Sequence, residues 1–223
     1  KKDRAVFEDL LYQVQRQPGA NSSADTRLPS GLQLGTGVRT AGTQKIFTTG
    51  SLELTDQPLD MTINGRGFFQ ITMPDGPINY TRDGTFHINN EGVVVNVNGY
   101  PLEPQITIPE QTNNLTISKD GIVQATMFGD PTPQELGQIE TADFINPAGL
   151  MATGGNLFQE TAASGAPVVG VPSEDGFGTL EQGALENSNV EVVEELVKMI
   201  TVQRAYEMNA RVVSAADGML QFL

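Results

Sequence analysis

The C-terminal part of the chain carries a helical pattern of apolar positions. Apolar side chains recur every seven residues, and further apolar residues widen this column into a stripe like a coiled-coil seam. Ser188 followed by Glu191 has the sequence of a capping box, which predicts a long amphipathic helix from Ser188 to Leu223. The residues expected to pack against other subunits along this helix are Val192, Leu196, Met199, Ile200, Gln203, Tyr206, Val213 and Leu220.

Two polar residues, Gln203 and Asp217, interrupt this stripe. Polar residues at such positions specify register more than they stabilise the helix pair. Periodicity alone leaves two arrangements open: the stripe folds back on its own domain, or it packs against another molecule.

Residues 38–177 show short strand-like runs separated by Asn-Gly and Asp-Gly dipeptides, which favour tight hairpin turns. No helical segments alternate with these strands, so a parallel sheet is not expected. The predicted fold is mainly β: an irregular antiparallel β domain inserted between terminal segments, with a long C-terminal α-helix that forms a coiled-coil-type packing surface. The expected turns are Asn64-Gly65, Asp75-Gly76, Asp83-Gly84, Asn98-Gly99 and Asp120-Gly121.

The N-terminal part is less regular. Residues 5–16 fit either a short amphipathic helix or an extended arm, and residues 20–37 have the composition of a long exposed loop. We therefore expect an N-terminal arm at 1–45, with an extended loop at about 11–29. A β-rich outer domain at 46–178 and a C-terminal linker and helix at 179–223, packing with the N-terminal segment, complete the expected division.

Composition excludes several classes of function. The net charge is −14, so binding of nucleic acid through phosphate neutralisation has little support. The chain has no cysteine and a single histidine, His87, which excludes thiolate or multi-histidine metal sites; His87 is expected on a strand face, as a polar residue next to a turn. No apolar run reaches the roughly eighteen residues of a membrane span, and residues 1–9 lack the apolar region of a signal peptide, so no membrane insertion is expected.

Charge is unevenly distributed along the chain. Residues 1–45 hold seven basic against four acidic residues, a net +3, which leaves −17 for the rest. Such asymmetry favours attraction between neighbouring subunits, although a flexible basic segment explains it equally simply.

No motif for catalysis or cofactor binding stands out. Gly65-Arg66-Gly67 lacks the third glycine and the following helix of a dinucleotide loop, so we interpret it as a hairpin turn before a buried aromatic strand. Asn89 to Glu91 falls short of a calcium loop. Two acidic pairs, Asp56 with Asp60 and Glu174 with Asp175, leave open a glycosidase that cuts peptidoglycan. We expect no enzyme activity and no cofactor.

Three segments together resemble the bacterial flagellar rod and hook family. They are the C-terminal run from Ser188 to Asn209, the run Ile63-Asn64-Gly65-Arg66-Gly67-Phe68-Phe69, and Tyr80-Thr81-Arg82-Asp83-Gly84-Thr85-Phe86. The segment from Arg4 to Ala20 further resembles the distal-rod members of that family. The resemblance covers nearly the whole chain.

The resemblance implies a structural subunit of the basal body. Many copies would stack helically into the distal rod, and this rod would cross the periplasm. Implied partners are copies of the same chain, proximal rod and hook subunits, and the ring proteins around the rod. It also implies type III export and lateral stacking by the segment from about Leu11 to Pro29, with Tyr12, Arg16 and Pro18 as packing residues.

Members of the family begin with a further amphipathic helix, and Lys1 is expected to lie beyond it. The alternatives are a hook or proximal-rod subunit of the same family, which the segment from Arg16 to Ala20 disfavours, and the glycosidase.

Overall fold

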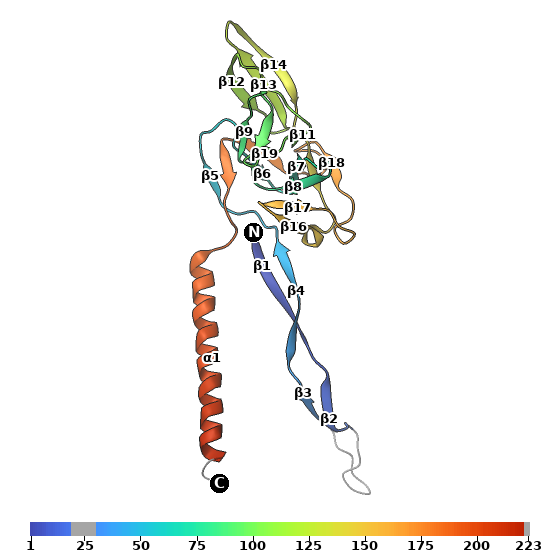
Figure 1. The fold of residues 1–223 in the computed structure, drawn as a ribbon, viewed down its shortest axis with the longest axis vertical. Helices are drawn as coiled ribbons and strands as arrows, with labels where there is room; N and C mark the ends of the chain where they lie inside the picture. Colours follow the sequence, from blue (N-terminus) through green and yellow to red (C-terminus); the bar gives the residue numbers. More distant parts are fainter. Residues whose placement is uncertain (19–29, 221–223) are drawn as a thin grey trace.

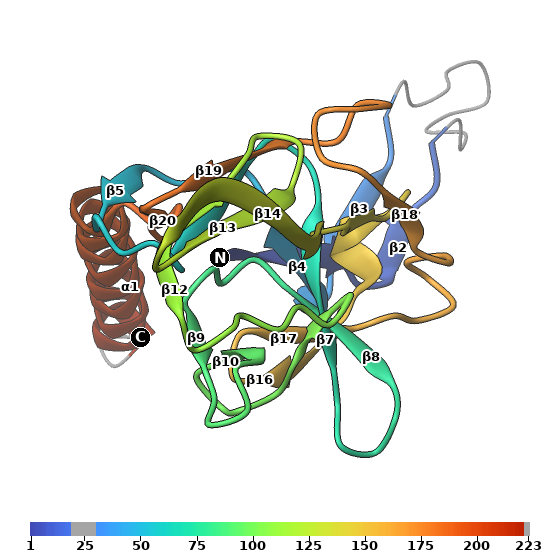
Figure 2. The same cartoon turned by 90° about the horizontal axis from the view of Figure 1, so that it is seen from above.

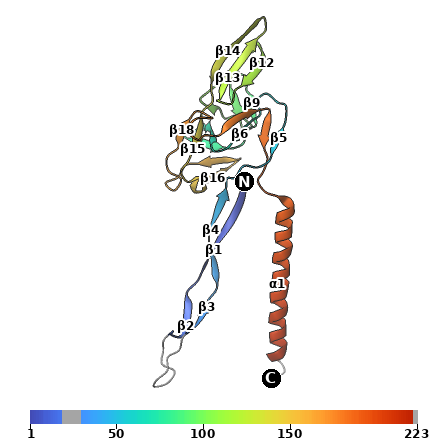
Figure 3. The ribbon, with the colours of Figure 1, turned by 180° about the vertical axis from the view of Figure 1, so that it is seen from behind.

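A computed structural model describes residues 1–18 and 30–220. It consists of a β-rich body with two extensions that leave the body in the same direction, an arm of paired strands and one long helix (Figures 1 and 3). We call strands β1–β4 the arm, strands β5–β20 the body, and the arm together with helix α1 the stem. Seen from above, α1 lies beneath β5 at one side of the body, while β2 and β3 lie toward the opposite side (Figure 2).

The body contains many short strands, because turn residues interrupt the chain every few positions. Their bounds are β5 (Leu52–Leu54), β6 (Met61–Asn64), β7 (Phe68–Thr72), β8 (Ile78–Thr81), β9 (Phe86–Ile88), β10 (Val94–Asn96), β11 (Leu102–Glu103), β12 (Thr112–Ile117), β13 (Ile122–Met127), β14 (Asp130–Gln138), β15 (Thr141–Asp143), the 3-10 helix η1 (Pro147–Gly149), β16 (Met151–Gly154), β17 (Leu157–Gln159), β18 (Val168–Gly170), β19 (Thr179–Gln182) and β20 (Ala184–Glu186).

These strands pair in antiparallel fashion in several sheets, which confirms the predicted fold class. The largest sheet has seven strands: β16, β17, β8, β7, β15 and β18 follow in that order, and β11 shares with β15 the second edge of β7. Strands β12, β13 and β14 form a separate three-stranded sheet. Two late strands return to early ones, since β19 pairs with β6 and β20 pairs with β5.

Strand β7 lies between two apolar cores. Successive side chains of a strand point to opposite faces, so Phe69 packs edge-on against Phe86 in the larger core, at a ring separation of 5.2 Å. Its neighbour Phe68 contacts Phe144 and Phe158 in the smaller core. Phe69 is fully buried. The aromatic pair predicted to be buried therefore joins both cores.

Three of the five predicted turns form, at Asp75-Gly76, Asn98-Gly99 and Asp120-Gly121, where the glycine N–H donates to the carbonyl three residues earlier. Gly65, Gly76, Gly99 and Gly121 have positive φ, as expected. Gly84 does not; it is required instead because a Cβ there would lie 1.5 Å from the carbonyl oxygen of Met61. Residues 65–67 are not a hairpin turn, which corrects our interpretation: they connect β6 to β7, which lie in different sheets.

The arm settles the ambiguity of residues 5–16, because they are extended. Strand β1 (Lys2–Asp9) pairs with β4 (Val38–Ile46), and β2 (Tyr12–Arg16) pairs with β3 (Leu32–Gly35). The prediction of one long loop at 20–37 was wrong for Leu32–Gly35, which form a strand. Residues 19–29 lie outside the described residues.

Helix α1 spans Val192–Leu220, so the long C-terminal helix is confirmed but begins later than predicted. The Ser188 hydroxyl accepts a hydrogen bond from the backbone N–H of Val190, at 3.2 Å, which closes a local turn before the helix starts. The capping box expected from Ser188 and Glu191 therefore does not mark the first helical residue. Within the described ranges, no helix is long and apolar enough to cross a lipid bilayer.

We predict that Gly84→Ala destabilises the body by about 3 kcal/mol, because the new methyl group overlaps the carbonyl oxygen of Met61 and forces β6 to shift. Gly137→Ala is the control, since its Cβ would make an ordinary contact of 3.5 Å with Ile106. Urea unfolding followed by circular dichroism measures both. Equal unfolding midpoints for the two variants would contradict the packing described at Gly84.

Candidate assembly surface

The apolar side chains of helix α1 are exposed to solvent. Among the predicted packing residues, Leu196 is 51%, Met199 57% and Tyr206 77% exposed. Val192, Ile200, Gln203 and Val213 are exposed as well; Leu220 ends the helix, and its side chain lies outside the described residues. Of the two arrangements that periodicity left open, folding back on the body is therefore not observed.

A second group of apolar side chains lies on another face of α1. Successive helical residues are turned by about 100°, which places Val197, Met208 and Val212 roughly opposite the stripe through Val192 and Met199. All three are more than half exposed. A helix that is apolar on two sides is typical of one buried between several neighbours.

The first turns of α1 hold a network of charges. Lys198 Nζ lies 2.6 Å from Glu194 and 3.2 Å from Glu195, and Lys2 Nζ of the arm lies 2.7 Å from Glu195. Hydrogen bonds from Lys198 and Lys2 lower the pKa of Glu194 and Glu195 respectively, and hydrogen bonding to Glu194 raises the pKa of Lys198. These contacts connect the start of β1 to the start of α1.

The arm also exposes apolar side chains along most of its length. Tyr12, Arg16 and Pro18 are all exposed, and a hydrogen bond to Asp9 raises the pKa of the Tyr12 phenol. Cross-strand pairs such as Lys45 with Asp3 cover little of this surface. The large apolar residues exposed on the arm are Val6, Phe7, Leu10, Leu11, Tyr12, Val14, Leu32, Leu34 and Val38.

The candidate chemical residues are held by backbone contacts, since Asp56 donates its N–H to the carbonyl of Gly183 and the carbonyl of buried Asp60 accepts from the N–H of Gly183. Asp56 has a positive φ, Glu174 ends a turn closed by its N–H to the carbonyl of Val171, and Asp175 lies in the next turn, closed by the N–H of Phe177 to the carbonyl of Glu174. Asn89 accepts hydrogen bonds from the backbone of Glu91 and Val93, so its side chain closes an Asx turn. Among the described residues, no cluster of three or more His, Cys, Asp or Glu side chains is arranged to hold a metal ion. His87 lies on strand β9, as expected, and its side chain is exposed.

Sequence reasoning missed a buried ionic cluster centred on Arg82. Its guanidinium donates to three backbone carbonyls: those of Gly65 at 2.8 Å and Gly67 at 2.7 Å in the β6–β7 connection, and that of Ile63 in β6 at 3.2 Å. The positive φ of Gly65 and Gly67 shapes this connection. The motif that superficially suggested a dinucleotide loop is therefore a cradle for an arginine.

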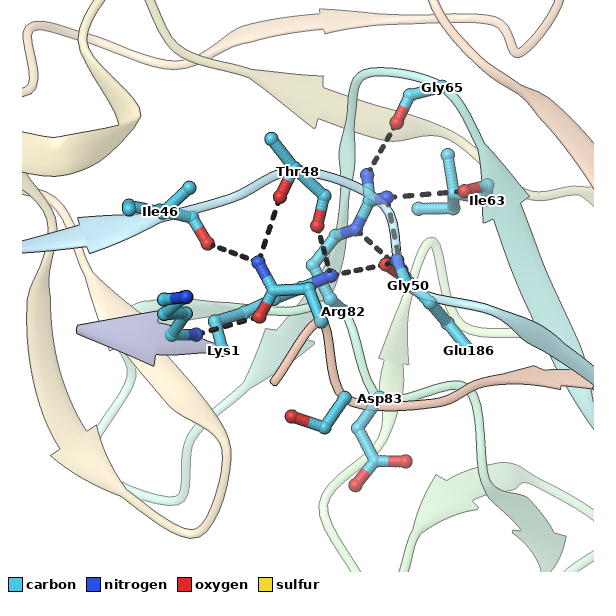
Figure 4. Close-up of polar contacts among 12 residues, drawn as sticks. Lys1, Ile46, Thr48, Gly50, Ile63, Gly65, Arg82, Asp83 and Glu186 are labelled. Atoms are coloured by element: carbon cyan, nitrogen blue, oxygen red, sulfur yellow. Dashed lines mark hydrogen bonds and ion pairs between the residues drawn. The ribbon is translucent and has the colours of Figure 1, made fainter. Parts of the chain in front are cut away.

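The remaining donors of Arg82 are directed at Glu186, the last residue of β20 (Figure 4). Nε and Nη2 lie 3.1 and 3.0 Å from the same carboxylate oxygen. The other oxygen accepts from Lys1 Nζ and from the backbone N–H of Gly50, at 2.9 Å in the latter case. Both side chains are more than nine-tenths buried. Every donor of the guanidinium and both carboxylate oxygens thus have partners.

Burial raises the pKa of Glu186, but the hydrogen bond from Lys1, the charge of Arg82 and the amide of Gly50 together outweigh it. The pKa therefore lies below the ordinary value of 4.5. A single carboxylate neutralised by two cations is a site where removal of the acid leaves buried positive charge uncompensated.

Comparison with known proteins gives the family. Residues 62–125 match the model of the flagellar hook protein FlgE/F/G D1 domain, and residues 181–223 match that of the flagellar basal body rod FlgEFG protein C-terminal region. The chain is 52% identical over 223 residues to the flagellar basal-body rod protein FlgG of Buchnera aphidicola subsp. Schizaphis graminum, covering all of this chain and 86% of the relative.

The FlgG protein of Caulobacter vibrioides is 49% identical over 99% of this chain and 85% of its own length. That of Bacillus subtilis is 33% identical over all of this chain and 85% of its own length. The chain belongs to the FlgG family of flagellar basal-body rod proteins.

This membership confirms the prediction of a distal-rod protein, made from the motifs around Arg66, Arg82 and Tyr206 and from the N-terminal segment. It is a structural protein of the flagellar basal-body rod and not an enzyme, so the glycosidase alternative was wrong. The hook and proximal-rod alternatives are likewise not supported. Family membership implies assembly with other rod and hook subunits of the basal body.

We predict that the stability provided by Glu186 depends on pH. Because the pKa is lowered in the folded state, this contribution is fully present above the unfolded pKa of about 4.5 and is lost as pH falls through the folded pKa. At pH 7, Glu186→Gln should lower the free energy of unfolding by about 3 kcal/mol, since it leaves Arg82 without its buried partner. The difference from the native chain should shrink below about pH 4.5.

Glu181→Gln makes the same chemical change on β19, where the carboxylate accepts a single exposed hydrogen bond from Asn64. This substitution should lower the free energy of unfolding by less than about 1 kcal/mol. Urea unfolding at pH 7 and pH 4 measures both variants. If the native chain and the Glu186→Gln variant have equal free energies of unfolding at pH 7, the role assigned to the carboxylate is contradicted.

Proposed function

We propose that copies of this chain polymerise helically into the distal rod, a rigid shaft that carries torque from the motor to the hook. The α1 helices would pack against one another inside the rod, and the bodies would form its outer layer. The observation that carries this proposal is the exposure of apolar side chains on opposite faces of α1, such as Met199 and Met208.

Exposed apolar surface on this scale favours an assembly. A monomeric soluble protein rarely exposes a contiguous apolar patch larger than several hundred Å². Most of the stability of a helix in a protein comes from the packing of its apolar face, and the 29 residues of α1 have no packed face in the single chain. Packing against helices of neighbouring copies would cover both faces, with Val192, Leu196, Ile200, Val213 and Leu220 on the predicted seam and Gln203 setting the register.

The arm is proposed to stack laterally between neighbouring subunits. Tyr12, Arg16 and Pro18 would contribute to this contact, together with the exposed side chains of β1 to β4. Part of the segment from about 11 to 29 lies outside the described residues, so its contribution rests on the resemblance alone. The division into residues 1–45, 46–178 and 179–223 likewise remains a prediction.

The resemblance supplies the wider context of this proposal. Copies of the chain would contact proximal rod subunits at one end of the distal rod and hook subunits at the other, with ring proteins around them. The rod would lie in the periplasm, reached by type III export.

We predict that Tyr206→Asp blocks rod assembly. The side chain is exposed in the single chain but would be covered in the rod, where an unpaired carboxylate costs several kcal/mol, so assembled rods per cell should fall at least about tenfold. The measurement is electron microscopy of hook–basal bodies from cells that carry the variant in place of the native gene.

Tyr206→Phe is the matched control, because it keeps the ring and adds no charge; it should assemble normally. Limited proteolysis of the purified Tyr206→Asp chain should show an intact body. Normal numbers of rods with Tyr206→Asp would exclude Tyr206 from the subunit contact and defeat the packing assignment.

A further inference from the structure

The stem and the body are joined by two chain segments without regular structure. Residues 47–50 lead from β4 into the body, and residues 187–191 lead from β20 to α1. Segments of this kind commonly act as hinges, because a few residues can absorb large changes of φ and ψ. The side chains around these two segments therefore decide whether the chain can bend there.

Phe47 anchors the first segment. Its ring packs edge-on against Phe68 and Phe158 of the smaller core, with ring centroids 5.3 and 5.2 Å apart. Edge-to-face contacts of this kind have a preferred orientation in addition to the apolar area that they bury. The chain leaving β4 is thus fixed to the body one residue after the strand ends.

Asn189 connects the second segment to strands β1 and β4 of the arm by hydrogen bonds. Its Oδ1 accepts a hydrogen bond from the backbone N–H of Lys2, at 2.7 Å. Its Nδ2 donates to the carbonyl of Ile46 and to the hydroxyl of Thr48, both at 2.9 Å. One amide therefore holds the start of β1, the end of β4 and the linker to α1 together.

Glu186 connects this assembly to the body. Lys1 donates from the beginning of the arm to Glu186 and to the carbonyl of Thr48, the latter at 3.0 Å. Arg82 holds the same carboxylate from the body side and is itself fixed by the carbonyls of the β6–β7 connection. Figure 4 shows Lys1 and Arg82 both directed at the carboxylate of Glu186.

We propose that Glu186, Asn189 and Phe47 form a rigid joint that sets the angle between stem and body. Each contact restrains a different segment: Phe47 the entry from β4, Asn189 the linker before α1, and Glu186 both of them relative to Arg82. With all three in place, a force on the body is passed to the stem without bending at residues 47–50 or 187–191. The purpose of this stiffness rests on the proposed function, while the stiffness itself is a property of the single chain.

The joint has a role beyond stabilising the fold of the body. Asn189 has no hydrogen-bond partner in β5–β20 among its described contacts; its partners are Lys2, Ile46 and Thr48. Lys1 likewise belongs to the arm. Loss of Asn189 should therefore loosen the stem and leave the stability of the body unchanged, which a residue of purely structural importance to the body would not do.

Pulsed electron–electron spin resonance tests the joint directly. The chain has no cysteine, so two introduced cysteines give one specific pair of spin labels. We choose Thr43→Cys on β4 and Asn113→Cys on β12, because both positions are exposed. The labelled chain is diluted with unlabelled chain. The native joint should give a narrow distance distribution. Asn189→Ala and Glu186→Gln should each widen it at least about twofold, as expected for a released hinge.

Glu103→Gln is the matched control, because it changes a carboxylate that accepts a hydrogen bond from the hydroxyl of Thr72 within the body, at 2.9 Å, and that contacts none of the joint residues. It should leave the distribution unchanged. Asn189→Gln, which keeps the amide but displaces it, should not restore the native width. Circular dichroism of each variant establishes that the body is folded; if Glu186→Gln fails to fold, Asn189→Ala decides alone.

A distribution in Asn189→Ala as narrow as in the native chain, with the body folded, would overturn the joint. That outcome would leave the proposed function standing, since assembly is measured separately by rods in cells. Conversely, a widened distribution together with normal rods would support the joint while assigning its stiffness no part in assembly.

Discussion

The central constraint on this molecule is that its burial is confined to the body. Strand β7 joins two cores in which side chains such as Phe69 and Phe144 are fully enclosed, whereas α1 and the arm bury almost nothing. Helical stability in proteins comes mostly from packing of an apolar face rather than from intrinsic propensity. A chain built in this way is complete in its body and leaves its stem uncovered, and the proposed assembly into a rod would supply the missing contacts.

Arg82 binds the residue at which the body ends and the linker to the stem begins. The two segments that resemble the rod and hook family most clearly in the body, around Arg66 and Arg82, are brought together because one supplies the carbonyl cradle and the other the guanidinium. Its partner Glu186 lies where the body ends and the linker to α1 begins. A buried ion pair is weak evidence for net stability compared with apolar packing, and its geometry is better suited to fixing an orientation. The position of this pair at the base of the stem agrees with that role.

Local patterns predicted part of this structure well. The long helix, the short antiparallel strands and three of the five Asx-Gly turns follow from periodicity and turn chemistry within a few residues. The helix start was misplaced because Ser188 closes a turn with Val190 and Asn189 bridges to the arm, contacts that depend on residues far away in the sequence. Residues 5–16 were ambiguous, since pairing of β1 with β4 and of β2 with β3, and not local propensity, decides their extended form.

The ionic cluster could not be predicted in the same way. Lys1 and Glu186 are separated by almost the whole chain, and nothing in the composition of either segment indicates that they meet. The Gly-x-Gly segment carried a usable signal, because two glycines flanking an arginine before a buried strand suggest an unusual backbone. The sequence did not indicate that this backbone accommodates the guanidinium of Arg82.

Hydrogen exchange measured by mass spectrometry tests the central claim most directly. In the isolated chain, backbone amides of α1 from Leu196 to Asp217 should exchange orders of magnitude faster than those of β7, because the helix has no packed face. In assembled rods the same helix should become protected to a degree comparable with β7. A helix as strongly protected as β7 in the isolated monomer would contradict the account, since its stability would then not depend on neighbouring subunits.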